Sequence, residues 1–141
     1  MELIKELTTL QEWKDGFTVM KELRTHLDEE TYLGLLAAMR DEGYRMFAVF
    51  RNNEMVAVTG IIQLTNLYNG KHIYVYDLVV AESHRSNGYG EMLLSYIHTL
   101  AENHGCSSVA LSSGLQRKEA HRFYEEKMGY KKTSYAFVKN L

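Results

Sequence analysis

The chain lacks several features that would point to a particular class of protein. It has no proline and a single cysteine, Cys106. One cysteine excludes an internal disulfide and fits a reducing compartment, so we expect a cytoplasmic protein. The absence of proline leads to no functional conclusion.

Long apolar runs and an excess of one charge are also missing. No stretch approaches the roughly 18 apolar residues of a membrane span, and residues 1–6 do not have the pattern of a signal peptide. The formal net charge of −2 gives no basis for binding nucleic acid or an acidic membrane surface. We therefore expect neither nucleic acid nor a membrane as a partner.

The usual patterns of a metal site or of a cysteine nucleophile are missing as well. No two of the six histidines have the His-x-x-x-His spacing of a zinc helix, and no second cysteine accompanies them. Cys106 comes just before a strand-like run, where the role of a small buried apolar residue is favoured. The sequence predicts no metal site.

The size and composition fit one globular enzyme domain. The chain has 141 residues, of which 45% are hydrophobic and 24% charged, which is enough to bury a substantial core. No linker, low-complexity stretch or internal repeat interrupts it. We expect residues 1–141 to form a single domain.

The apolar pattern predicts alternating strands and helices. Asp28 is a candidate N-cap, Asn52-Asn53 a turn and Asn69-Gly70 a hairpin. The order predicts an α/β (α+β) fold in which a mixed central sheet is flanked by about four helices. Strands are expected near 3–7, 44–51, 55–67, 73–80 and 107–112, with a final strand or strand pair over 130–139; helices are expected near 10–23, 29–40 and up to 103, with a last helix carrying Tyr124 and ending at Gly129.

The strand over 73–80 contains an acid, Asp77. Simple alternation places Asp77 on one face with Ile73, Val75 and Val79. Because both faces are largely apolar, the strand is expected to be central in the sheet. A carboxylate there is costly unless it has a partner or a function.

A glycine-containing loop joins this strand to an amphipathic helix. It consists of Arg85, Ser86, Asn87, Gly88, Tyr89 and Gly90. A strand–loop–helix unit directs several backbone N–H groups at one point, where the positive end of the helix dipole adds to their field. Gly88 and Gly90 allow the backbone to approach an anion closely, and Arg85 adds a permanent charge. The pattern predicts a phosphate-binding loop.

Two motifs together resemble the GNAT superfamily of acyl-CoA-dependent N-acetyltransferases. The first is Arg-x-x-Gly-x-Gly after the Val79-Val80 strand end, and the second is Ala-x-x-Phe-Tyr-Glu, which begins at Ala120 and is followed by Gly129-Tyr130. The predicted element order is also that of this family. The resemblance covers about residues 2–141, although the N-terminal third matches only in pattern.

The resemblance implies acetyl-CoA as the acetyl donor, held mainly by backbone groups. The implied contact residues are the strand end Leu78, Val79 and Val80, the loop residues Arg85, Ser86, Asn87, Gly88, Tyr89 and Gly90, and Arg117. Many relatives have asparagine where this chain has Arg117. Since arginine cannot accept a hydrogen bond, Arg117 is expected either to reach a coenzyme A phosphate or to face water.

The implied catalytic residues are Tyr124 and Asp77. The phenol of Tyr124 has a reference pKa of about 10, close enough to that of a thiol to protonate the departing thiolate. Relatives often carry Glu-Asp where this chain has Tyr76-Asp77, so the general base is open. Asp77 is expected either to accept the amine's proton or anchor the amine, or to be a structural hydrogen-bond acceptor for a neighbouring loop.

The function that follows is direct transfer of an acetyl group from acetyl-CoA to a primary amine. The alternatives are an acyl-CoA-binding sensor with little turnover and an interaction module. The acceptor is not specified: a small amine, a lysine side chain and a protein N-terminus stay open, as does a homodimer.

Overall fold

The protein is described by a computed structural model that covers all 141 residues. The chain forms two compact units, Met1–Ala110 and Leu111–Leu141. The first unit contains the predicted phosphate loop and the sheet except for its last residue, Leu111, and Tyr124 belongs to the second unit.

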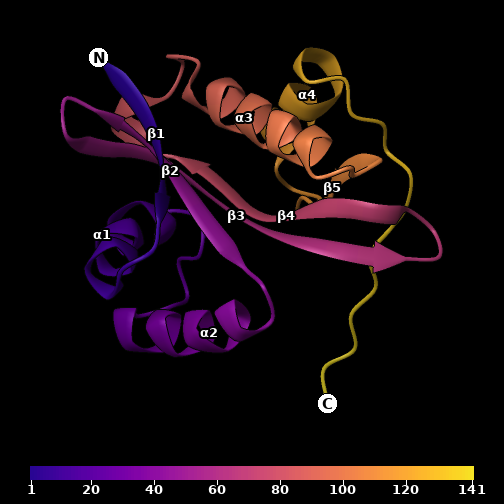
Figure 1. The fold of residues 1–141 in the computed structure, drawn as a ribbon, viewed down its shortest axis with the longest axis horizontal. Helices are drawn as coiled ribbons and strands as arrows, with labels where there is room; N and C mark the ends of the chain where they lie inside the picture. The colour runs from indigo at the N-terminus through magenta and orange to yellow at the C-terminus, as the bar shows by residue number, and fades with distance from the viewer. The chain divides into compact units, whose positions relative to one another are not determined.

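The sheet has five strands in the order β1-β2-β3-β4-β5 (Figure 1). The pairs β1–β2, β2–β3 and β3–β4 are antiparallel, and β4 connects to its neighbour β5 through a helix, the usual connection of a parallel pair. This is the mixed central sheet that the sequence predicts. The strands are β1 (Glu2–Leu7), β2 (Arg45–Arg51), β3 (Glu54–Asn66), β4 (Gly70–Val80) and β5 (Ser108–Leu111); the helical segments of the first unit are α1 (Leu10–Met20), α2 (Glu29–Asp41), the 3₁₀ turn η1 (Glu82–His84) and α3 (Tyr89–Asn103).

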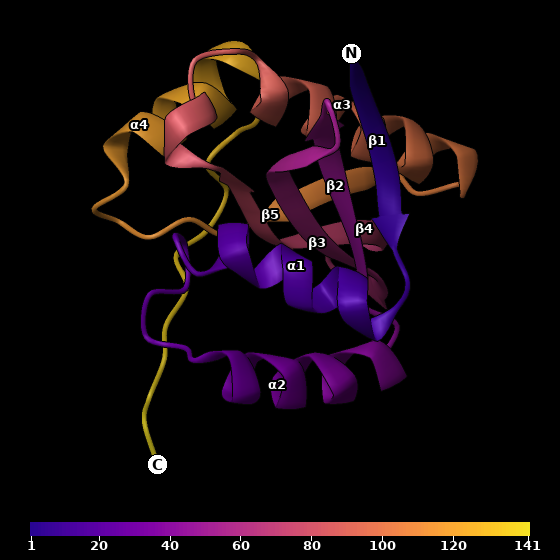
Figure 2. The same cartoon turned by 90° about the vertical axis from the view of Figure 1, so that its left-hand side faces the viewer.

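Helices cover both faces of the sheet. Figures 1 and 2 show α1 and α2 on one face and α3 on the other. The core on the α1–α2 face joins helix residues such as Val19 and Leu36 to the sheet residues Met46 and Val58. On the opposite face α3 buries Leu93, Leu94, Ile97 and Ala101. Both faces of β4 are therefore covered, which confirms that this strand is central.

The helix cap and the two turns that the sequence predicts are present in the structure. The Asp28 carboxylate caps α2 by accepting a hydrogen bond from the Thr31 N–H at 2.7 Å. Asn52 and Asn53 both have positive φ, as the tight β2–β3 turn requires. In the β3–β4 hairpin Gly70 has φ +66° and pairs with Asn66, so β4 begins three residues earlier than predicted.

A β-bulge in β4 changes the face on which Asp77 lies. Gly60 pairs with Asp77 while Ile61 pairs with Val75, so Tyr76 has no partner in β3. The extra residue shifts the alternation by one position. Asp77 consequently lies on the α1–α2 face, where Tyr44 hydrogen-bonds it, and not on the face of Ile73 and Val75 as simple alternation predicts.

Gly60 leaves the space that this arrangement needs. A Cβ at Gly60 would lie 1.5 Å from the Tyr44 hydroxyl oxygen. The Tyr44 phenol therefore lies directly over the backbone of β3, opposite Asp77. No side chain other than hydrogen is compatible with this position of Tyr44.

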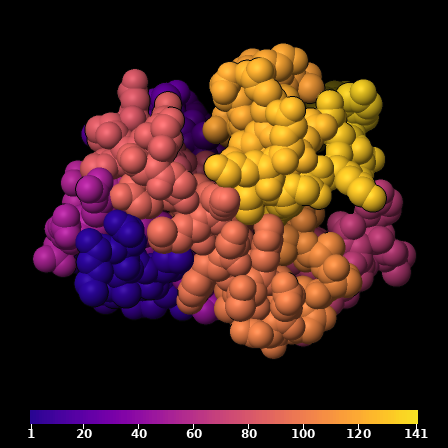
Figure 3. Space-filling model, turned by 90° about the horizontal axis from the view of Figure 1, so that it is seen from above, coloured from indigo at the N-terminus to yellow at the C-terminus, as the bar shows by residue number.

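The second unit differs from the prediction in two ways. The helix carrying Tyr124 is split into α4 (Lys118–Arg122) and a π-helical turn, η2 (Phe123–Lys127), and it ends as predicted at Gly129, whose φ is +76°. The strand predicted over 130–139 is wrong, because these residues have no regular secondary structure. Tyr135, Phe137 and Val138 are exposed there, and the yellow C-terminal residues lie at the surface in Figure 3. Strand-like composition produces a strand only where a pairing partner and a surface to pack on exist.

Replacing Gly60 with alanine is expected to lower the free energy of unfolding by about 3 kcal/mol. The new methyl group must displace Tyr44, which combines an overpacking cost with the loss of a buried hydrogen bond. Urea denaturation measures the change. Gly34→Ala in α2 is the control, because its Cβ meets no atom within 4 Å and alanine favours a helix. Equal stability of the Gly60→Ala variant and the wild type would contradict this packing.

Candidate active site

The loop between β4 and α3 leads into a helix whose first backbone N–H groups have no intrahelical partner. After η1, Ser86 and Gly88 adopt positive φ values of +68° and +80°, and the chain turns into α3 at Tyr89. Gly88 is the N-cap and supplies no side-chain cap, and the first intrahelical bond runs from the Met92 N–H to the Gly88 carbonyl at 3.0 Å. The first turn of α3 therefore begins without a capping side chain, at the end of the helix where an anion is favoured.

Hydrogen bonds from within the loop and its flanks hold its shape. The Asn87 side-chain amide donates to the His84 carbonyl at 2.9 Å, and Arg85 Nε donates to the Val80 carbonyl at 3.2 Å. The Tyr89 side chain is buried and anchors the start of α3, so Tyr89 has only its backbone to offer a ligand. Ser86, Asn87 and Gly88 are exposed.

Residues of both positive and negative charge lie next to the loop. Arg85 lies 3.7 Å from the Glu22 carboxylate and is 55% exposed, which leaves the guanidinium accessible to an anionic ligand. Glu22 also accepts a hydrogen bond from the Glu82 N–H at 2.8 Å. The loop is thus attached to the segment that follows α1.

Asp77 is buried, and both of its carboxylate oxygens have partners. Arg24 Nε donates to Oδ1 at 2.9 Å, and the Tyr44 hydroxyl donates to Oδ2 at 2.6 Å. Burial, together with the charge of Asp77 and the hydrogen bond to it, raises the pKa of Tyr44 well above its ordinary value, so Tyr44 remains the donor. A carboxylate held on both oxygens matches the structural alternative predicted for Asp77 better than that of a free base.

Tyr124 and Arg117 lie together in the second unit. The Tyr124 ring is buried, and this burial raises the pKa of its phenol, while the charge of Arg117 and a hydrogen bond from it lower the pKa in part. The charge of Arg117 thus acts on the Tyr124 phenol, and both predicted roles of Arg117 stay open. The π-helical turn at Tyr124 is a local feature that often marks functional sites.

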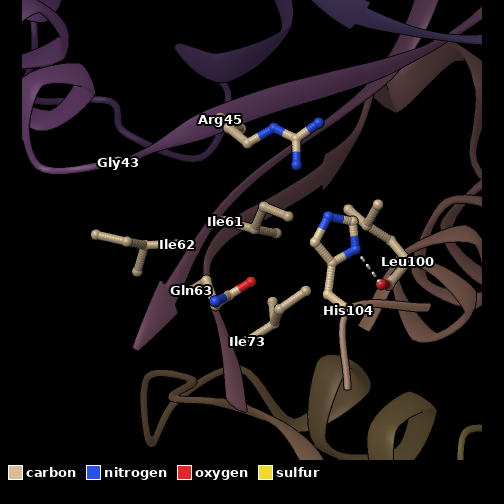
Figure 4. A pocket seen from close by; sticks show the side chains of 8 residues that line it. All are labelled: Gly43, Arg45, Ile61, Ile62, Gln63, Ile73, Leu100 and His104. Atoms are coloured by element: carbon tan, nitrogen blue, oxygen red, sulfur yellow. Dashed lines mark hydrogen bonds between the residues drawn. The ribbon is translucent and has the colours of Figure 1, made fainter. Parts of the chain in front are cut away.

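A separate cavity of about 250 Å³ lies between the sheet and the C-terminal part of α3 (Figure 4). Arg45 at its edge is held by two hydrogen bonds to Glu6, both 2.9 Å long, and His104 bonds the Leu100 carbonyl. None of the predicted site residues lines this cavity. Its lining residues are Gly43, Arg45, Ile61, Ile62, Gln63, Ile73, Leu100 and His104.

The sequence did not predict which residues would surround Asp77. Arg24, Tyr44 and Thr59 all contact Asp77, yet they come from the α1–α2 connection, the residue before β2 and the middle of β3. Sequence spacing carries no signal for such contacts, since Arg24 is 53 positions from Asp77. The single hint is the cost of a buried acid, which requires partners of this kind.

Comparison with known proteins gives the family. The profile described as the acetyltransferase (GNAT) family matches residues 7–130. The chain is 45% identical over 137 residues to a protein of Bacillus subtilis named uncharacterized N-acetyltransferase YhdJ, with 96% of each chain covered. It is 29% identical over 121 residues to an aminoalkylphosphonate N-acetyltransferase of Salmonella typhimurium, covering 84% of this chain and 78% of that protein.

Solved structures share the fold at low identity. The aminoglycoside N-acetyltransferase AAC(6′)-Iy, solved in complex with CoA, has a TM-score of 0.86 and 12% identity, with 100% of this chain and 95% of that chain covered. A ribosomal-protein-alanine N-acetyltransferase from Brucella melitensis biovar Abortus has a TM-score of 0.83 and 15% identity, with both chains fully covered.

The chain belongs to the GNAT acetyltransferase family. It is an N-acetyltransferase, an enzyme that transfers an acetyl group to an amine, which confirms the predictions of family, fold class and enzyme activity. No helix is long and apolar enough to span a membrane, and no group of three or more His, Cys, Asp or Glu side chains is placed to hold a metal ion.

We expect Asp77→Asn to lower the melting temperature while leaving the pH profile of kcat/KM unchanged in shape. The amide keeps the size of the side chain but loses the charge that pairs with Arg24, and a weakened buried hydrogen bond costs about 1–3 kcal/mol. Calorimetric melting and kcat/KM measured between pH 6 and pH 10 test both parts. Loss of the rising limb of the profile in this variant would instead identify Asp77 as the general base.

Proposed function

We propose that residues 1–141 form one N-acetyltransferase domain that binds acetyl-CoA through the Arg85–Gly90 loop. The observation that carries the proposal is the uncapped start of α3 behind Gly88, beside an accessible arginine. The backbone N–H groups of this turn would hold the pyrophosphate, with Arg85 adding charge. The family membership and the structural similarity to a CoA complex support this assignment.

The strand end Leu78, Val79 and Val80 would lie along the pantetheine arm and the acetyl group. These residues directly precede the loop, so one continuous segment would hold the donor from thioester to pyrophosphate. Arg117 is proposed either to contact coenzyme A or to support Tyr124, whose pKa its charge lowers.

The proposed reaction is direct attack of a neutral amine on the thioester carbonyl. A bond forms between the amine nitrogen and the carbonyl carbon, and the carbon–sulfur bond breaks. Tyr124 gives its phenolic proton to the departing thiolate, and the proton released by the amine restores the phenol through solvent. Because burial raises the pKa of Tyr124 above its ordinary value of 10.0, the phenol keeps its proton at neutral pH.

We propose a small primary amine as the acceptor. An aminoalkylphosphonate acetyltransferase is among the relatives similar over most of the chain, which supports this choice over a protein substrate. A screen of small amines, a lysine peptide and N-terminal peptides with acetyl-CoA, read as released thiol, tests it. Acetylation of peptides alone would overturn the choice of a small amine and leave the proposed donor site in place. A cytoplasmic location is proposed on the single cysteine.

The loop assignment predicts that Gly90→Ala weakens binding of coenzyme A without destabilising the fold. Gly90 is in the first turn of α3 and has no positive φ, and alanine is the better helix former by about 1 kcal/mol. Any loss of affinity therefore reports a Cβ placed in the path of the ligand. We expect roughly a 10- to 100-fold weaker Kd in calorimetry, from one or more lost charge-assisted bonds.

Gly88→Ala is expected to weaken binding of coenzyme A as well. Because Gly88 has a positive φ, the effect of backbone strain in this variant must be separated from the effect of a lost contact with the ligand. Gly105→Ala is the matched control, since Gly105 has φ +71° close to the +80° of Gly88 but lies beyond the other end of α3. Both variants should melt lower, and only Gly88→Ala should lose affinity. A wild-type protein with no measurable affinity for acetyl-CoA or coenzyme A would refute the proposed site.

We expect Tyr124→Phe to lower kcat by about 10²–10⁴-fold with an unchanged Kd for acetyl-CoA. The variant keeps the buried ring and removes only the proton donor. Tyr135→Phe is the control, because Tyr135 is 80% exposed. The raised pKa adds a second readout: wild-type activity should not fall between pH 7 and pH 10. Normal kcat in Tyr124→Phe, with chemistry shown to limit the rate, would exclude the phenol from the reaction.

A further inference from the structure

The bulge in β4 is held by side chains rather than by strand pairing alone. Tyr76 has no partner in β3, and its carbonyl accepts a hydrogen bond from Arg24 Nη2 at 2.8 Å. The neighbouring Asp77 carbonyl accepts one from the Thr59 hydroxyl at 2.7 Å. A bulge disrupts the ladder, and its buried polar groups need other partners. Arg24 and Thr59 supply them.

Arg24 holds two consecutive residues of the bulge at once. Its Nη2 binds the Tyr76 carbonyl, and its Nε donates to the Asp77 carboxylate. Tyr44 holds the other carboxylate oxygen and stacks on the Tyr76 ring, with centroids 5.9 Å apart and an interplanar angle of 19°. We name Arg24, Tyr44 and Asp77 the bulge clamp. Its contacts fix the backbone, the carboxylate and the aromatic side chain at this point of β4.

The need for fold stability does not account for the chemistry of the clamp. The Arg24 side chain is 41% exposed, and a partly exposed ion pair typically contributes about 1 kcal/mol or less. Replacing a buried charged pair by apolar residues of similar volume is often neutral or stabilising. The charged contacts do, however, determine the direction of the peptide groups at residues 76 and 77, which apolar packing would not.

The clamp acts on the part of β4 that matters for the proposed donor site. Leu78 follows Asp77 directly and pairs with Thr59 in β3, and Ala81, just beyond the strand, donates its N–H to the Val56 carbonyl at 2.8 Å. The segment from Leu78 to Val80 pairs along its whole length with β3. The clamp lies just before this segment, and the Ala81 bond lies just after it. A rotation of the bulge would turn the Leu78 peptide.

We propose that Arg24 and Tyr44 are positioning residues for acetyl transfer: they orient the strand end Leu78–Val80 against the donor by holding the bulge. The proposal rests on the proposed function. It also connects the α1–α2 segment, which contains Arg24, to the donor strand. Neither residue touches the reacting atoms, and both act through the backbone of β4.

The test compares Arg24→Met with Arg45→Met in the same protein. Arg45 is a matched control because it also forms a charge-paired contact, with Glu6, and is also 41% exposed. Both variants should melt a few degrees lower. Only Arg24→Met should lose kcat, by roughly 10- to 100-fold, as expected when bound groups are displaced by about 1 Å, while its Kd for coenzyme A stays within twofold of the wild type.

Two further variants keep the test decisive if Arg24→Met does not fold. Tyr44→Phe removes one hydroxyl and should lower kcat in the same direction. Arg24→Lys keeps the charge but lacks the planar fork that binds carboxylate and carbonyl together, so it should restore only part of kcat. Equal kcat in Arg24→Met and Arg45→Met would overturn the proposal, and so would a loss confined to the affinity for coenzyme A.

Amide hydrogen exchange gives a readout that does not depend on activity. In Arg24→Met the Leu78 and Val79 amides should exchange at least 10-fold faster, whereas in Arg45→Met they should be unchanged. If the wild type acetylates no amine, the proposed function fails while exchange still tests the clamp. Unchanged exchange at Leu78 in an active enzyme would overturn the clamp alone.

Discussion

A buried carboxylate on the α1–α2 face of the sheet is the constraint on which much of the first unit depends. The Arg24 guanidinium and the Tyr44 hydroxyl each hold one oxygen of the buried Asp77 side chain, and burial of a carboxylate without such partners is costly. Tyr44 in turn can reach Asp77 only because Gly60 has no side chain. A single acid thus determines a glycine in β3, a tyrosine before β2 and an arginine between the first two helices.

The same contacts connect packing to chemistry. The bulge turns Asp77 toward Tyr44 and leaves the Tyr76 side chain 37% exposed on that face. A few residues later the strand ends and the chain forms the loop with an uncapped helix start. One segment of about fifteen residues, 76–90, therefore carries the bulge that the clamp holds, the proposed thioester contacts and the proposed pyrophosphate site. Its geometry has to be rigid, because orientation of the donor contributes much of the rate in such transfers.

Local patterns predicted the fold well where the structure depends on neighbouring residues. The Asp28 cap, the Asn52-Asn53 turn, the central strand and the loop opening α3 all follow from short-range preferences. The family resemblance rested on two such local motifs, and comparison with known proteins confirms it.

The features that were not predicted from the sequence depend on long-range contacts or on irregular backbone. The bulge at Tyr76 reverses the alternation on which the face of Asp77 was predicted, and nothing in residues 73–80 marks it. The helix that carries Tyr124 contains a π-helical turn, in which each hydrogen bond spans one more residue than in an α-helix. The regular helical period of the apolar residues does not reveal such a turn. The strand predicted over 130–139 came from the apolar pattern, and the exposed Phe137 and Val138 show that this pattern did not suffice. Contacts such as Arg24 with Asp77 join residues that only the folded chain brings together.

The most direct test of the account maps the amide resonances of the ¹⁵N-labelled protein during titration with coenzyme A. The largest shift changes should fall on two groups of amides, those of Ser86 to Gly90 and those of Leu78 to Val80. The amides of Gly43 and Leu100 at the separate cavity should not move. Shift changes concentrated at that cavity, or no saturable change at millimolar coenzyme A, would contradict the central claim that the loop and strand end bind the acetyl donor.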